Sequence, residues 1–115
     1  MRHSAWTLSL LLALVASGKP TRAENRANAY LLSLAPEALA AMLGKVVGGG
    51  CAGKTTFYMG VGTSGIAKDK GFWSVRCADG RAYAVEANPD GTSSVVECAA
   101  LKALNAGECF KKLAN

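Results

Sequence analysis

Two glycine-rich stretches contain residue types that bind nucleotides in other proteins. The first, GGGCAGKT from Gly48 to Thr55, satisfies the phosphate-loop pattern G-x-x-x-x-G-K-[ST] at every fixed position. A working phosphate loop lies between a buried strand and a helix whose amino terminus faces the phosphates. Here a helix is predicted before Gly48 and a strand after Lys54, so the order is inverted. We expect no nucleotide binding and predict a flexible connection whose glycines let Cys51 enter a disulfide.

The second stretch, Gly60–Gly65, satisfies the dinucleotide pattern G-x-G-x-x-G and follows a predicted strand. The dinucleotide-binding fold also requires a helix that begins at these glycines and leads to a parallel strand. Residues 66–71 are too few and too polar for that crossover, so we predict a long loop between antiparallel strands. Loops of this kind are often binding elements. The candidate binding loop runs from Gly62 to Lys70 and contains Thr63 and Ser64, with Lys68 and Lys70 as expected exposed contacts to an acidic partner.

The first 23 residues have the three parts of a secretory signal: basic Arg2 and His3, an apolar run from Ala5 to Ala16, and a polar end at Thr21-Arg22-Ala23. The apolar run is shorter than the roughly 20 residues that cross a bilayer as a helix. We therefore predict cleavage after Ala23, a periplasmic or secreted protein, and no membrane span in the mature chain.

Removal of the signal changes what chemistry is available. It leaves ten basic and eight acidic residues, without a long basic run, so nucleic-acid binding is not expected. It also removes His3, the only histidine, and with it every imidazole mechanism. Asp79 and Asp90 each precede a glycine, where a structural turn role is favoured. We predict no catalytic residue, no cofactor and no metal site.

Four cysteines, Cys51, Cys77, Cys98 and Cys109, lie in the predicted mature chain. An even number in an oxidising compartment predicts two disulfides. Structural zinc sites usually contain closely spaced pairs, which are missing here. Free redox thiols are the other alternative.

The chain after the signal divides into a helical segment, residues 24–50, and a strand-rich segment, residues 51–115, which together form one domain. In the first, apolar spacing predicts a short helix before Ala35 and a second helix from Pro36 to Val47. In the strand-rich segment, the sequence predicts an antiparallel meander and a short carboxy-terminal helix around Leu101 to Leu104. The predicted strands are Thr55–Val61, Phe72–Cys77, Arg81–Ala87 and Ser94–Ala99.

The turn at Ala78-Asp79-Gly80 sets which side chains share a face of the sheet. A three-residue loop pairs Val75 with Tyr83 and Trp73 with Val85, which places these apolar side chains together. On the other face, Ser74, Arg76, Ala82, Ala84 and Glu86 are expected to meet solvent.

This register limits the disulfide pairing. Cys77 and Cys98 would flank the third strand, roughly 9.5 Å apart, beyond the reach of a disulfide. Cys51–Cys77 and Cys98–Cys109 are therefore favoured, with the crossed pairings left open.

The sequence thus predicts a small α+β domain, with amino-terminal helices packed on a four-stranded antiparallel meander. The leading functional hypothesis is a non-enzymatic interaction protein, an accessory subunit or inhibitor of another exported protein. The alternative is a periplasmic thiol redox or stress-response protein that uses Cys98 and Cys109.

Overall fold

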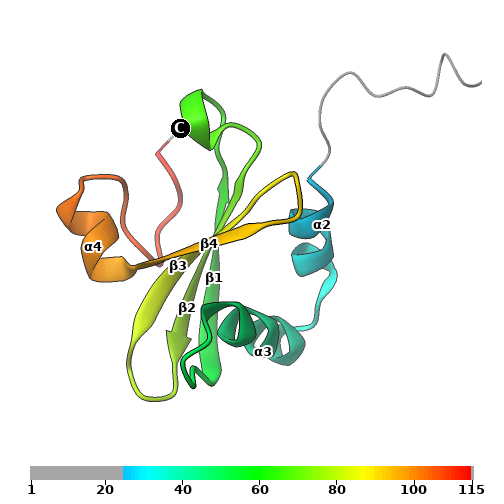
Figure 1. Ribbon diagram of the computed structural model, residues 1–115, viewed down its shortest axis with the longest axis vertical. Coiled ribbons are helices and arrows are strands. Elements are labelled where there is room, and N and C mark those ends of the chain that lie inside the picture. The colour runs from blue at the N-terminus through cyan, green and yellow to red at the C-terminus, as the bar shows by residue number, and fades with distance from the viewer. Residues whose placement is uncertain (1–24, 115) are drawn as a thin grey trace, which may run out of the picture.

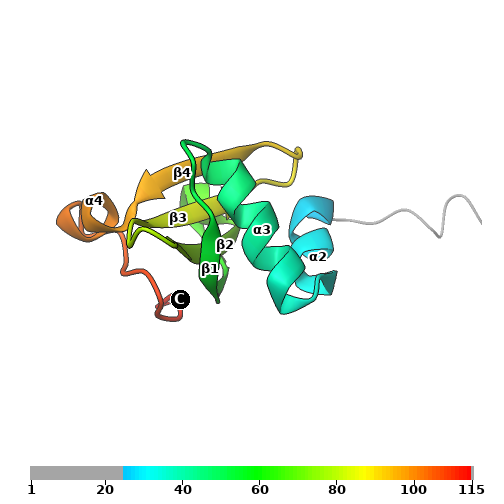
Figure 2. The same cartoon turned by 90° about the horizontal axis from the view of Figure 1, so that it is seen from below.

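The computed structural model describes residues 25–114, and the predicted signal peptide at residues 1–23 lies outside that range. Two amino-terminal helices pack on one face of a four-stranded antiparallel sheet whose spatial strand order follows the chain (Figures 1 and 2). The elements are α2 (Arg26–Ser33), α3 (Pro36–Val47), β1 (Gly53–Val61), η1 (Gly65–Ala67), β2 (Gly71–Cys77), β3 (Ala82–Ala87), β4 (Ser93–Glu97) and α4 (Cys98–Ala103). The predicted α+β meander is confirmed.

The two amino-terminal helices separate where the sequence predicts. The side chain of Asn25 caps α2 by accepting a hydrogen bond from the Asn28 N–H, 2.9 Å away. Helix α3 begins at Pro36, where the missing N–H costs no helical hydrogen bond. It ends at Gly48–Gly50, whose φ angles of 75°, 57° and 78° turn the chain back towards the sheet.

The predicted register of the central hairpin is confirmed, since Val75 pairs with Tyr83 and Trp73 with Val85. The side chains of Trp73, Val75 and Val85 are buried against the helices, together with Leu43 of α3. We call this side of the sheet the helix face.

Two predicted boundaries near the carboxyl end are wrong. Strand β4 ends at Glu97, two residues before the predicted end, and α4 begins at Cys98, three residues before the predicted start. Residues 99–103, AALKA, are strong helix formers, and their propensity outweighs the β-branched run before them.

We call the side of the sheet away from α2 and α3 the opposite face. The prediction that this face meets solvent is wrong for two of its residues. We expected Ser74 and Ala84 to meet solvent, but their exposed fractions are 0% and 4%. Residues 104–114, the C-terminal segment, return across this face. The N–H of Phe110 donates to Ser74 Oγ at 2.9 Å, and the N–H of Leu113 donates to the Met59 carbonyl at 2.9 Å.

Both favoured disulfides are confirmed. Cys51–Cys77 joins the end of the helical segment to β2, with α-carbons 5.1 Å apart. Cys98–Cys109 joins the first residue of α4 to the C-terminal segment, with α-carbons 5.7 Å apart. Of the helices in residues 25–114, none has the length and apolar character needed to cross a membrane.

Candidate functional site

The candidate binding loop, Gly62–Lys70, projects from the end of the sheet between β1 and β2, at the top of Figure 1. Its two ends are joined by backbone hydrogen bonds. The Gly62 N–H donates to the Lys70 carbonyl at 3.0 Å, and the Asp69 N–H donates to the Gly62 carbonyl at 2.9 Å. The single turn η1 forms the tip. The predicted irregular loop is therefore a closed, hydrogen-bonded structure.

The base of this loop is tied to the rest of the domain. The Asn25 side-chain amide donates to the carbonyl of Asp69 at 2.9 Å and to that of Ala87 at 2.8 Å. Lys70 pairs with Glu86, with 3.7 Å between Nζ and Oε1. The two side chains are only 29% and 31% exposed, so Lys70 is not the exposed contact we expected, and Glu86 is not on an open solvent face.

The remaining predicted loop residues Thr63, Ser64 and Lys68 are exposed. Between them lies the most exposed large apolar side chain of residues 25–114: Ile66, in η1, is 90% exposed. Sequence reasoning missed this residue because it examined the loop for glycine patterns and charge. The available signal was a single β-branched apolar residue in an otherwise polar, glycine-flanked segment, where it has no burial role.

The phosphate-loop match occupies a different place and has a local explanation. Gly48–Gly50 form the turn after α3, and Lys54 is exposed on β1, so the observed order is helix, turn and strand, as predicted. A side chain on Gly53 would collide with the Ala40 carbonyl. The glycines of the pattern thus serve the helix end and its close packing on the sheet.

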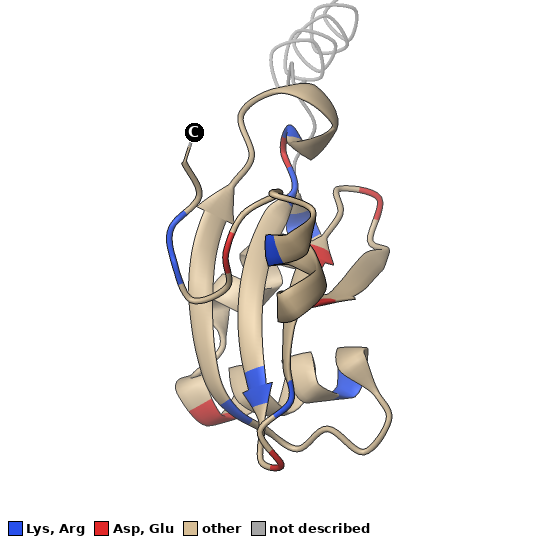
Figure 3. Cartoon of the chain, turned by 90° about the vertical axis from the view of Figure 1, so that its left-hand side faces the viewer, with Lys and Arg blue, Asp and Glu red and all other residues tan. Residues whose placement is uncertain are grey.

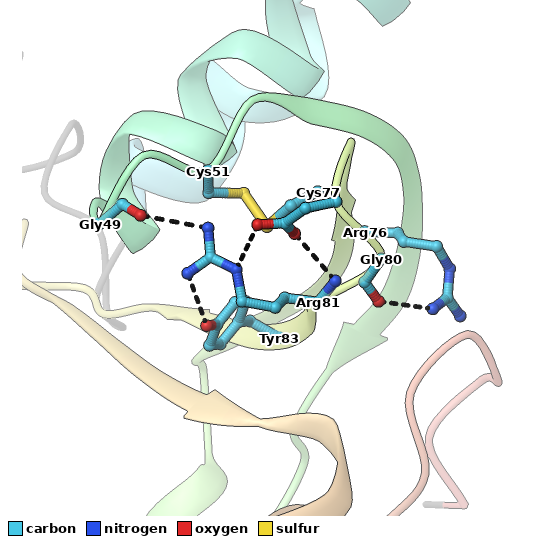
Figure 4. A network of polar contacts seen from close by, with 8 residues as sticks. Gly49, Cys51, Arg76, Cys77, Gly80, Arg81 and Tyr83 are labelled. Carbon is cyan, nitrogen blue, oxygen red and sulfur yellow. Dashed lines mark hydrogen bonds and ion pairs between the residues drawn. A yellow bond between two sulfur atoms is a disulfide. The ribbon is translucent and has the colours of Figure 1, made fainter.

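Arg81 ties this glycine turn to the β2–β3 turn beside the Cys51–Cys77 disulfide (Figure 4). Its guanidinium donates to Asp79 Oδ2 at 2.7 Å, to the Gly49 carbonyl at 3.1 Å and to the Tyr83 hydroxyl at 3.3 Å. The hydrogen bond from the Arg81 backbone N–H, followed by that from its guanidinium, lowers the pKa of Asp79. With three partners in the chain, this guanidinium has a structural role that sequence reasoning did not identify.

The cysteines and Asp90 also have partners within the chain. All four cysteines are in disulfides. Asp90 accepts hydrogen bonds from the hydroxyl and N–H of Thr92, which lower its pKa. Within residues 25–114, no group of three or more histidine, cysteine, aspartate or glutamate side chains is placed to hold a metal ion.

No protein-family model matches this chain, and comparisons with curated proteins and with solved structures give no match either.

Proposed function

We propose that this protein is a small exported interaction protein, without catalytic activity, that binds another exported protein through the Gly62–Lys70 loop. The exposure of Ile66 carries the proposal. A large apolar side chain at the tip of a hydrogen-bonded loop is exposed to water at a cost, which burial in a partner's pocket removes.

The construction of the loop supports this role. Backbone hydrogen bonds close its two ends, and Asn25 and the Lys70–Glu86 pair hold its base. A loop already fixed in one conformation loses little conformational entropy when it binds. Exposed Thr63, Ser64 and Lys68 surround Ile66 with hydroxyl groups and one positive charge. The partner therefore presents an apolar pocket with an acidic rim.

Export is supported by the two disulfides, which persist in oxidising compartments outside the cytoplasm. A non-enzymatic role is supported by the engagement of Asp79, Asp90 and the cysteines in local structure.

Site-specific photo-crosslinking tests the proposal. A photoreactive amino acid replaces Ile66 in one protein and Leu32, an exposed residue of α2, in a matched control; Leu32 is 53% exposed. Both oxidised proteins are irradiated in a cell-envelope extract. We expect one stoichiometric adduct from position 66 that position 32 does not give.

The variant Ile66→Ser should weaken binding of that partner about tenfold or more, because it removes the apolar anchor without changing a buried residue. Leu32→Ser, on α2, should leave the affinity unchanged. Equal affinity of Ile66→Ser and the unsubstituted protein, or the same adducts from both crosslinking positions, would reject the Ile66 loop as the binding surface.

A further inference from the structure

A groove of about 660 Å³ lies on the opposite face of the sheet, between the Gly62–Lys70 loop, α4 and the C-terminal segment. Its size is within the roughly 300–1,000 Å³ range of small-molecule sites. Four large apolar side chains from four parts of the chain line it, namely Met59 of β1, Phe72 of β2, Leu101 of α4 and Leu113 of the C-terminal segment.

The rim of the groove is positively charged. Lys102, Lys111 and Lys112 line it together with one acidic residue, Glu108. Glu108 pairs with Lys111, with 3.4 Å between Oε1 and Nζ. Neither Lys102 nor Lys112 forms an ion pair within residues 25–114. Figure 3 views this side, with basic segments on α4 and on the C-terminal segment.

Lys112 is positioned by aromatic rings rather than by a carboxylate. Its Nζ lies 5.8 Å from the ring centre of Phe57 and 5.5 Å from that of Tyr58, both on β1. Such contacts hold a cation in place without neutralising it. No carboxylate neutralises this charge within residues 25–114.

Several backbone groups around the groove are already hydrogen-bonded within the chain. The N–H and carbonyl of Gly62 bond to Lys70 and Asp69, the Ala106 N–H bonds to Leu101, and the Leu113 N–H occupies the Met59 carbonyl. A hydrocarbon chain carries no hydrogen-bonding groups, and it gains free energy when an apolar floor removes it from water.

From this arrangement we propose that the groove binds a single-chain amphiphile with an anionic carboxylate head, such as a fatty acid. The hydrocarbon chain lies along the floor formed by Met59, Phe72, Leu101 and Leu113, and the carboxylate lies at the rim near Lys102 and Lys112. This ligand-binding activity is separate from the protein-binding role of the Ile66 loop.

Calorimetric titration of the oxidised protein tests the proposal with three ligands of equal chain length: decanoate, decanol and decyltrimethylammonium, each as monomers in solution. We expect decanoate to bind most tightly and the cationic ligand most weakly. Affinity should rise about two- to fourfold for each methylene added from octanoate to dodecanoate, as burial of the chain requires. Equal binding of all three head groups, or no heat with decanoate at either of two well-separated temperatures, overturns the proposal.

Two variants locate the binding in the groove. Lys102→Glu with Lys112→Glu should weaken decanoate binding about tenfold, whereas the matched reversal Lys45→Glu with Lys54→Glu, on α3 and β1, should not. Ala106→Trp, at an exposed position, fills the groove and should abolish binding. Retained binding in Ala106→Trp, or equal losses in the two charge-reversal proteins, contradicts binding at this groove. Partner crosslinking at Ile66 is unaffected by either result.

Discussion

The two faces of the sheet are covered in different ways. The helix face is covered by regular helices, and the side chains between them, such as Leu43 at 0% and Trp73 at 2% exposure, are closely packed. The opposite face is covered by α4 and by a segment without helix or strand, held by the Cys98–Cys109 disulfide and the hydrogen bonds of Phe110 and Leu113. Figure 2 shows the two coverings on either side of the sheet.

Because the coverings differ, the helix face contributes stability and the opposite face keeps space for a ligand. Buried apolar side chains such as Leu43 and Trp73 stabilise the helix face through the hydrophobic effect. A covering fixed at a few points leaves the groove above Phe72 open. The same sheet thus supports a closed core on one side and a ligand site on the other.

The largest expected effect comes from shortening a core leucine on the helix face. Leu43→Ala should lower the free energy of unfolding by about 2–5 kcal/mol, since it removes transfer energy and leaves a cavity. Leu113→Ala, at a half-buried position of the C-terminal segment, should cost about 1 kcal/mol. Urea denaturation of both variants measures the contrast. Equal losses would mean that the two faces contribute equally to stability.

The disulfides offer the next comparison. In the loop-closure account, removing Cys98–Cys109 or Cys51–Cys77, with sequence separations of 11 and 26, should each cost about 3 kcal/mol. Their effects on the groove should differ. Cys98→Ser with Cys109→Ser frees the C-terminal segment and should abolish decanoate binding, whereas Cys51→Ser with Cys77→Ser should preserve it under conditions where both proteins remain folded.

Thiol titration of the unsubstituted resting protein tests the alternative redox hypothesis for Cys98 and Cys109. We expect no titratable thiol, and no change with mild reductant. Release of two thiols by mild reductant, with full recovery on oxidation, would instead favour a redox role.

The helix face could be predicted from sequence and the opposite face could not, for a physical reason. Alternation of Trp73, Val75, Tyr83 and Val85 around one turn fixes the register locally. The burial of Ser74 depends on Phe110, 36 residues away, in a segment with no apolar period. The sequence around a small polar residue on a strand does not indicate that a distant segment will bury it and donate a hydrogen bond to it.

A smaller effect is expected from the buried polar contact on the helix face. Asn28, 4% exposed, accepts a hydrogen bond from Trp73 Nε1 at 2.7 Å and donates to the Tyr58 hydroxyl at 3.0 Å. Asn28→Ala leaves the indole N–H buried without a partner, and should cost about 1–3 kcal/mol. Ser33→Ala, on the exposed side of α2, should change stability by less than about 0.5 kcal/mol.

Thermal and urea unfolding of these two variants measure the contrast. If Asn28→Ala lost no more stability than Ser33→Ala, the hydrogen bonds of Asn28 would not stabilise the helix face. The sequence did contain a signal for this residue: Asn28 lies three positions before Leu31 on the buried side of α2.

The smallest expected effect concerns pH and the turn that joins β2 to β3. Hydrogen bonds from Arg81 hold the folded-state pKa of Asp79 below its ordinary value of 3.8. The stabilisation is therefore complete above the unfolded-state pKa and is lost as pH falls through the folded-state pKa. Asp79→Asn should unfold at a slightly lower urea concentration than the unsubstituted protein at neutral pH, and the difference should vanish in strong acid.

Urea midpoints across this pH range test the assignment. A difference that stays constant from neutral pH to strong acid would show that Asp79→Asn acts through the shape of the turn and not through the carboxylate charge. Because Arg81 also donates to the Gly49 carbonyl, loss of this charge should loosen the connection between α3 and the sheet. Protonation of Asp79 in acid should therefore weaken the packing of α3 on the sheet at this end. Decanoate binding by the unsubstituted protein needs only the opposite face. Its affinity should fall at a higher pH than the one at which Asp79 is protonated, because the ligand's own carboxylate is protonated there.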